Sequence, residues 1–195
     1  MRDLRDLAGL LLGFMPWLLF LFLSGHTLAS LERGIIISLV VSVVFGLRGL
    51  WRGFILQWGT LIFFSAAFVL VNIMETVWVA ENMGILTNSF LAGLMWFTLI
   101  IGRPFALQYA RAALPKEQWH NPGLIRSGRF ITIVWAVLMT ISAAVSVFRK
   151  ADIVSLPDWV YFDISLLIII SGLAYTTFYR RKKRMDREGM QSPNN

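Results

Sequence analysis

A few polar side chains lie inside or at the ends of long apolar stretches of this 195-residue chain. Polar groups are costly in such surroundings and often mark a functional site. The candidates are Gln57, Asn72, Asn88 and Asp163 inside the stretches, with Glu75 and Arg103 at their ends. A carboxylate such as Asp163 can hold a cation or a proton. It can equally reach the membrane–water interface or bond to a neighbouring helix, and no second acid in mid-stretch completes a proton relay.

Residue types that carry common enzymatic chemistry are scarce. The chain has no cysteine, which excludes disulfides, thiolate metal sites and thiol nucleophiles. Its two histidines, His26 and His120, lie far apart in the sequence and outside the apolar stretches, so we interpret them as solvated or interfacial. The sequence contains no paired His-Glu helix motif, no P-loop and no Gly-x-Ser-x-Gly elbow. These observations predict a protein that is not an enzyme and uses no cofactor or metal.

Composition indicates a membrane protein. Hydrophobic residues make up 57% of the chain and the mean hydropathy is +0.67, whereas soluble domains are about 45–50% apolar. A bilayer core about 30 Å thick requires about 20 apolar residues per helix. Six stretches meet or approach that length: 7–25, 29–47, 54–74, 86–102, 129–148 and 159–179. We therefore expect an all-α, polytopic bundle of six transmembrane helices in one domain (1–185), followed by a disordered cytoplasmic tail (186–195).

Positive charges occupy alternate gaps between these stretches. Fifteen of the 18 Lys and Arg residues lie at the amino-terminal end, in the second and fourth gaps and after the last stretch. The other three lie in the first and fifth gaps. Because loops rich in Lys and Arg stay in the cytoplasm, both termini are predicted to be cytoplasmic. Leaving out any one helix would mix the two sets of gaps.

A short helix is expected at residues 105–114, directly after the fourth stretch. Gly102-Arg103-Pro104 ends the preceding helix, because glycine and a residue before proline disfavour its continuation. The spacing separates two polar from two apolar side chains, Gln108 and Arg111 against Leu107 and Leu114. We therefore predict an amphipathic helix lying on the cytoplasmic surface of the membrane. It is either a plain connector or an element for partner docking or gating.

A basic run follows the sixth stretch and comprises Arg180, Arg181, Lys182, Lys183 and Arg184. Such runs can bind nucleic acid, but this one directly follows a predicted transmembrane helix. That position favours anionic lipid headgroups, which attract each basic residue by about 1 kcal/mol near the surface. We predict membrane lipids as partners and no nucleic acid.

Several short motifs occur in a characteristic order. They are Phe14-Met15-Pro16, Gln57-Trp58, Gly102-Arg103-Pro104-Phe105, Leu114-Pro115, Trp135-Ala136 and Asp158-Trp159-Val160-Tyr161-Phe162. Over roughly residues 10–180 the chain thereby resembles the bacterial intracellular septation protein A family and its uncharacterised relatives. It departs from that family at Arg103, where members usually have lysine, and at His120-Asn121-Pro122, which members lack. The chain therefore resembles the divergent relatives more than the septation protein itself.

The resemblance implies a non-catalytic protein of the bacterial inner membrane. Such a protein acts in cell division and envelope maintenance through contacts with other inner-membrane proteins. A small solute or ion transporter or channel is the alternative, because six helices can divide into two three-helix halves of opposite orientation. The sequence shows no convincing repeat between residues 7–74 and 86–179. A polar cavity at mid-membrane would favour transport and a filled apolar core the interaction protein, while the oligomeric state stays open.

Reporter fusions test the predicted topology. Fusions after Arg52, near Lys116 and after Arg184 should report the cytoplasm, because they follow or lie within the basic gaps. Fusions near Glu81 and Asp152 should report the opposite side. A result that is inverted near Lys116 alone would contradict the six-helix arrangement.

Overall fold

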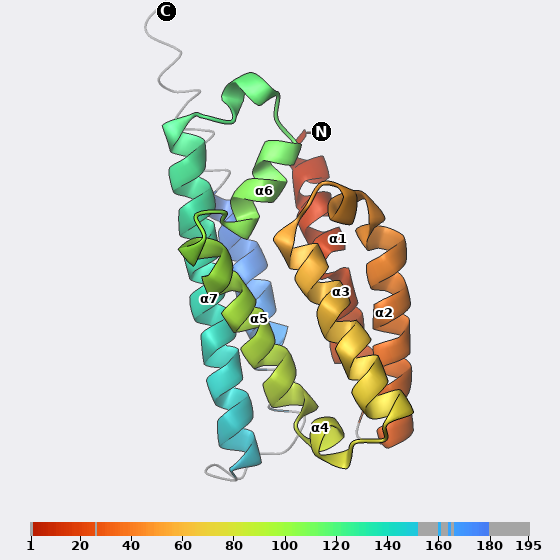
Figure 1. Ribbon diagram of the computed structural model, residues 1–195. Helices are drawn as coiled ribbons and strands as arrows, with labels where there is room; N and C mark the ends of the chain where they lie inside the picture. Colours follow the sequence, from red (N-terminus) through yellow and green to blue (C-terminus); the bar gives the residue numbers. More distant parts are fainter. Residues whose placement is uncertain (1, 26, 152–159, 161–163, 165, 180–195) are drawn as a thin grey trace, which may run out of the picture.

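The computed structural model describes residues 2–25, 27–151, 160, 164 and 166–179, and the regular structure within them is helical, without a strand. The helices are α1 (Arg2–Leu23), α2 (Leu28–Trp51), α3 (Ile55–Ala67), the π-helix η1 (Phe68–Ile73), α4 (Val77–Glu81), α5 (Met83–Ile100), α6 (Phe105–Ala112), the 3-10 helix η2 (Lys116–Gln118) and α7 (Pro122–Lys150). A further apolar helix covers Leu166–Tyr179. The long helices form an upright bundle (Figure 1). We call the end that holds the N-terminus and α6 the amino-terminal end, and the opposite end, which holds α4, the distal end.

Four of the six predicted spans are confirmed as helices long and apolar enough to cross a membrane. They are Leu28–Leu47, Ile55–Ile73, Met83–Ile100 and Pro122–Lys150. Two shorter apolar helices, Gly13–Leu23 and Leu166–Tyr179, lie in the regions of the first and sixth predicted spans. The crossings at these two helices and the orientation of the bundle stay predictions. The expected tail, residues 186–195, lies outside the described residues.

Helix α7 begins seven residues before the predicted start of the fifth span at residue 129. The side chain of Asn121 accepts a hydrogen bond from the backbone N–H of Gly123 at 2.8 Å, and Pro122 occupies the first turn. Both are favourable at a helix start, because they satisfy or remove N–H groups that have no partner within the helix. The 29 residues of α7 extend over about 43 Å. The helix is therefore longer than the hydrocarbon core and offers α6 a surface at the amino-terminal end.

The expected short helix is present, but its apolar face packs against protein and not against lipid; its position relative to the membrane surface stays a prediction. Helix α6 packs into the bundle beside α7, and Phe105, Ala106 and Leu107 are at most 4% exposed. A Cβ atom at Gly128 of α7 would lie only 2.7 Å from Leu107 Cβ, so this glycine permits the close approach. Gln108, expected to face water, accepts a hydrogen bond from the backbone N–H of Ile55 at 3.0 Å. Periodicity placed Leu107 on an apolar face, but it did not reveal that this face meets protein or that Gln108 bonds to α3.

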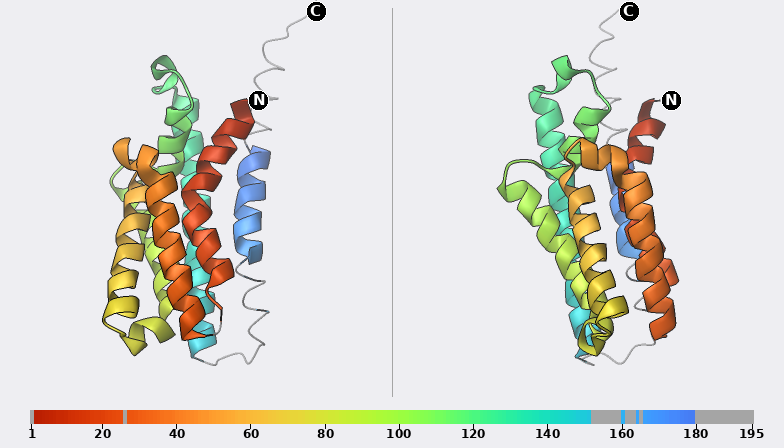
Figure 2. Two further views of the ribbon diagram at one scale, coloured as in Figure 1. Left: turned by 90° about the vertical axis from the view of Figure 1, so that its right-hand side faces the viewer. Right: turned by 45° about the vertical axis from the view of Figure 1, so that its right-hand side comes forward.

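The interior is filled by aromatic rings from both sides of the bundle. Helices α1, α2 and α3 form one side, while α5 and α7 form the other (Figures 1 and 2). Phe14 of α1 stacks on Trp135 of α7 with ring centroids 4.8 Å apart. The ring centroids of Phe63 in α3 and Phe90 in α5 are 4.9 Å apart. Such ring pairs contribute about 0.5–1.5 kcal/mol beyond the burial of their area, so they join the two sides at mid-bundle.

Three interhelical hydrogen bonds follow one pattern, in which a tryptophan indole N–H donates to a threonine hydroxyl. The pairs are Trp17–Thr60 at 2.8 Å, Trp96–Thr140 at 3.1 Å and Trp135–Thr176 at 3.1 Å. Each threonine hydroxyl in turn donates to the backbone carbonyl four residues earlier in its own helix. The bonds tie α1 to α3, α5 to α7, and α7 to the helix Leu166–Tyr179. They satisfy N–H groups that would otherwise lack a partner in apolar surroundings.

Substitution of Gly128 tests the seating of α6. Gly128→Ala should lower the thermal midpoint of the purified protein, because the new methyl group meets the backbone of Leu107, and overpacking costs about 1–3 kcal/mol. Gly93→Ala is the matched control, since a Cβ at Gly93 would meet no heavy atom of the described residues within 4 Å. The control should be neutral or gain up to about 1 kcal/mol from helix propensity. Equal midpoints for the two variants would contradict the close approach of α6 to α7.

Candidate functional site

A cavity of about 820 Å³ opens toward the distal end of the bundle. Its walls come from α1 and the turn that follows it, from the start of α2, from η1, α4, α5 and α7, and from Ile169 of the last helix. Ligand sites in proteins usually enclose about 300–1,000 Å³, with mainly apolar walls and a few polar groups. This distal cavity therefore has the size and composition of a binding site.

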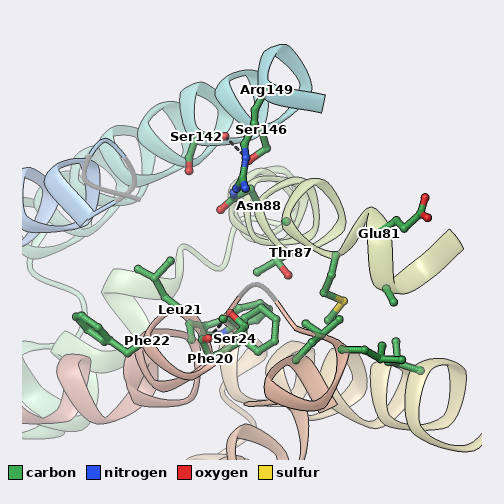
Figure 3. A pocket seen from close by; sticks show the side chains of 18 of the residues that line it. Phe20, Leu21, Phe22, Ser24, Glu81, Thr87, Asn88, Ser142, Ser146 and Arg149 are labelled. Carbon is green, nitrogen blue, oxygen red and sulfur yellow. Dashed lines mark hydrogen bonds between the residues drawn. The ribbon is translucent and has the colours of Figure 1, made fainter. Parts of the chain in front are cut away.

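The polar wall of the distal cavity is formed by Thr87 and Asn88 of α5 and by Ser142 and Ser146 of α7. Asn88 Nδ2 donates to Ser146 Oγ at 2.8 Å, and the Ser146 hydroxyl donates to the Ser142 carbonyl at 3.0 Å. Thr87 Oγ1 is buried and has no hydrogen-bond partner among the described residues. Arg149 extends from the end of α7 toward Asn88 (Figure 3). Side chains on this wall can donate hydrogen bonds to a bound group and accept hydrogen bonds from it.

The opposite wall is apolar and rests on the aromatic interior. Phe20 and Leu21 of α1 line this side across from Asn88 (Figure 3), together with Val71 of η1. Trp17 also lines the cavity, and its indole N–H is already bonded to Thr60. The ring of Trp17 packs 5.0 Å from that of Phe64, centroid to centroid. The cavity is therefore polar on one side and apolar on the other.

Acidic side chains lie at the rim of the distal cavity. Glu75 lies after η1 and lines the cavity. Its φ is 49°, a backbone conformation that residues other than glycine rarely adopt. Glu81 of α4 pairs with Lys150 at 3.5 Å, which joins α4 to the end of α7. Both partners are about half exposed, so the pair contributes at most about 1 kcal/mol. Within the described residues, no three His, Cys, Asp or Glu side chains come together as a candidate metal centre.

A second polar cluster lies between the distal cavity and the amino-terminal end. Gln57 of α3 is 9% exposed and fits a groove formed by Gly46 and Gly49 of α2. A Cβ at Gly49 would lie 2.7 Å from Gln57 Cδ, so a larger residue would displace the amide. Gln57 Oε1 and the hydroxyl of Tyr109 in α6 are buried without a hydrogen-bond partner in the described part of the chain. An unsatisfied buried group costs about 1–3 kcal/mol, so this cluster requires an explanation.

Among the described residues, the structure brings two of those singled out from the sequence into one site. Asn88 and Glu75 both line the distal cavity. Asn72 lies nearby in η1, but its Nδ2 donates to the carbonyl of Glu32 at 3.4 Å and so links η1 to α2. Gln57 belongs to the second cluster. Arg103 is exposed after α5, where its carbonyl accepts a hydrogen bond from Gln108 at 2.7 Å.

The remaining candidates lie outside the described residues. They are Asp163 and the basic run Arg180, Arg181, Lys182, Lys183 and Arg184. Their predicted roles, a cation or proton site and contact with lipid headgroups, stay predictions.

Sequence reasoning missed four residues of the two sites. Ser142 and Ser146 are four residues apart, which places them on one face of a helix, and that spacing could have identified them. Thr87 and Tyr109 gave no such signal. Threonine is common in membrane helices, and Tyr109 lies in a segment that we expected to face the membrane surface.

Comparisons with protein-family models, with curated proteins and with solved structures give no match to this chain. The resemblance to the septation protein A family therefore stays a prediction that depends on short motifs. The distal cavity and the Gln57 cluster are the observations from which a function can be argued.

Titration of Tyr109 tests the burial of the second cluster. Burial raises the pKa of Tyr109 from 10.0 to about 12, while the Gln57 amide beside it acts in the opposite direction. Because the folded pKa exceeds the unfolded one, the stability linked to this proton is complete below pH 10 and is lost as pH rises through 12. The ultraviolet difference between wild type and Tyr109→Phe should show a phenol that ionises near pH 12. Ionisation near pH 10 would contradict a buried hydroxyl.

Proposed function

We propose that this chain is a non-catalytic, multi-pass membrane protein that acts by binding other membrane components, with the distal cavity as its binding site. Four long apolar helices support residence in a membrane. The resemblance noted above suggests the bacterial inner membrane and a role in envelope maintenance or cell division. The distribution of Lys and Arg suggests that both termini are cytoplasmic. Other inner-membrane proteins and lipids are the partners of such a protein.

One observation carries this proposal: packed aromatic rings close the floor of the distal cavity. The ring centroids of Trp17 and Phe63 are 5.1 Å apart, and those of Phe63 and Phe90 are 4.9 Å apart. Rings from α1, α3 and α5 therefore form one cluster. Phe64 is completely buried beside Trp17. A binding protein gains rigidity from such a floor, whereas a conduit requires a path past it. The filled interior therefore favours binding over conduction.

The two walls of the cavity indicate what kind of group would bind. Phe20 and Leu21 offer apolar surface, and about 25 cal/mol is gained for each Å² of apolar area removed from water. Asn88 and Ser146 offer hydrogen bonds on the facing wall. A molecule or a partner segment with an apolar body and a hydrogen-bonding end satisfies both walls.

A transporter is the second candidate, and the distal cavity itself favours it. A site that opens to one side of a bundle is what one state of an alternating-access transporter presents. In such a protein the aromatic rings at the floor of the cavity would have to separate in the conformation that opens to the opposite side. Asp163, which the sequence suggested as a cation or proton site, would then be required for flux.

Cysteine labelling separates the two candidates, because the chain has no cysteine of its own. Ser146→Cys places a thiol on the polar wall of the cavity. In reconstituted vesicles this thiol should react with a membrane-impermeant maleimide from the distal side only. Ser38→Cys is the matched buried control, since Ser38 is 0% exposed, and it should stay unlabelled from both sides.

Labelling of Ser146→Cys from both sides of the membrane would contradict the proposal and favour alternating access. Flux measurements on the same vesicles give an independent test. We expect negligible ion or solute flux in the wild type. Measurable flux that Asp163→Asn abolishes, with folding intact, would establish the transporter instead.

A further inference from the structure

A small void lies between α1, α2 and α3, separate from the distal cavity. It is lined by Gly13 and Pro16 of α1, Ser42 and Gly46 of α2, and Gln57 and Thr60 of α3. Its volume is about 10 Å³. A void must offer roughly 10–15 Å³ by this measure to hold one water molecule. The space therefore suits a single water and is too small for a solute or a file of waters.

Two side chains in or beside this void are more than nine-tenths buried and carry unpartnered polar atoms: Gln57 lines the void, and Tyr109 lies next to Gly13, which also lines it. Gln57 is 9% exposed, and its Oε1 has no hydrogen-bond partner among the described residues. Tyr109 is 7% exposed, and its hydroxyl is equally unpartnered there. The Tyr109 hydroxyl lies directly over Gly13, because a Cβ at that glycine would collide with the hydroxyl oxygen. An acceptor and a donor thus approach one void from α3 and α6.

Pro16 leaves a further acceptor beside the void. Proline has no backbone N–H, so it cannot donate to the carbonyl of Leu12 one turn earlier in α1. Leu12 directly precedes Gly13, which lines the void. In apolar surroundings a carbonyl left in this way needs a donor from elsewhere.

The hydroxyl groups on the void wall have already used their hydrogens. Thr60 donates to the Leu56 carbonyl at 2.7 Å and also accepts from the Trp17 indole at 2.8 Å. Ser42 donates to the Leu39 carbonyl at 2.7 Å. These two side chains can therefore not supply the hydrogen that Gln57 Oε1 lacks. The Tyr109 hydroxyl is near enough to Gln57 to feel its amide, but the two make no direct hydrogen bond, and a water molecule between them can satisfy both.

We infer that the void is a specific binding site for one water molecule, held by Gln57, Tyr109 and the carbonyl of Leu12. The water donates one hydrogen to Gln57 Oε1 and the other to the Leu12 carbonyl, and it accepts the hydroxyl hydrogen of Tyr109. Three hydrogen bonds are the usual number for a buried water. This site does not depend on the proposed function of the distal cavity.

The water site assigns a role to the glycines of α2 and to α6. Gly46 leaves the room that the water fills, because its Cβ would lie 3.0 Å from Gln57 Oε1. Through the water, Tyr109 links α6 to α1 and α3 near the amino-terminal end of the bundle. Gln57 is then a residue that positions helices.

Water-edited solid-state NMR of the full-length protein in lipid nanodiscs tests this inference. Magnetisation from water should reach the Gln57 side-chain amide at short mixing times, as a bound water would provide. The backbone amide of Phe64, whose side chain is 0% exposed, should receive none and serves as the dry control. Gly46→Ala should abolish the Gln57 signal because its methyl group occupies the void, whereas Gly93→Ala should preserve it.

A high-resolution structure of the wild-type protein decides the matter even if Gly46→Ala fails to fold. We expect a density peak within hydrogen-bonding distance of both Gln57 Oε1 and the Tyr109 hydroxyl. A Gln57 amide bonded directly to Tyr109, with no peak in the void and no transfer from water, would overturn the inference. So would a Gln57 signal that persists undiminished in a folded Gly46→Ala variant.

Discussion

The arrangement of the long helices depends on satisfying indole N–H groups in apolar surroundings. An unbonded N–H in apolar surroundings costs several kcal/mol. Threonine answers this need because its hydroxyl hydrogen bonds within its own helix, which leaves the oxygen free to accept from a neighbour. Trp17, Trp96 and Trp135 each find such a threonine on an adjacent helix. Each bond is formed only at one register of the two helices, so the three bonds restrict how the helices slide past one another.

Aromatic packing then determines where space remains between the two sides of the bundle. Rings such as Phe14, Phe90 and Trp135 fill the middle, where α1 and α3 face α5 and α7. Toward the distal end the facing residues become smaller and more polar, as at Thr87 and Ser146, and the distal cavity opens there. Between α1, α2 and α3, the glycines of α2 leave room for the Gln57 side chain and for a void the size of one water molecule. Both sites thus occur where large rings give way to small residues.

Helix α6 connects the two sides at the amino-terminal end. Its residues reach three neighbours: Gln108 accepts from the first turn of α3, Leu107 lies on Gly128 of α7, and Tyr109 lies over Gly13 of α1. The first of these contacts satisfies a backbone N–H that has no partner within its own helix. A movement of α6 would therefore disturb both sides of the bundle together. These contacts make it a structural brace, a role that its amphipathic pattern alone did not indicate.

The sequence by itself determined which segments form long apolar helices, because length and composition alone identify them, and four of the six are confirmed. It did not locate the start of α7, which we expected at residue 129 and which the Asn121-Pro122 cap places at residue 122. Only the tertiary structure decided which side chains share a site: Asn88 and Ser146 are 58 residues apart, and their meeting depends on how α5 packs on α7. It also decided what the apolar face of α6 contacts. Lipid and protein interior are almost equally apolar, so hydrophobicity shows that a face avoids water without showing which of the two it meets.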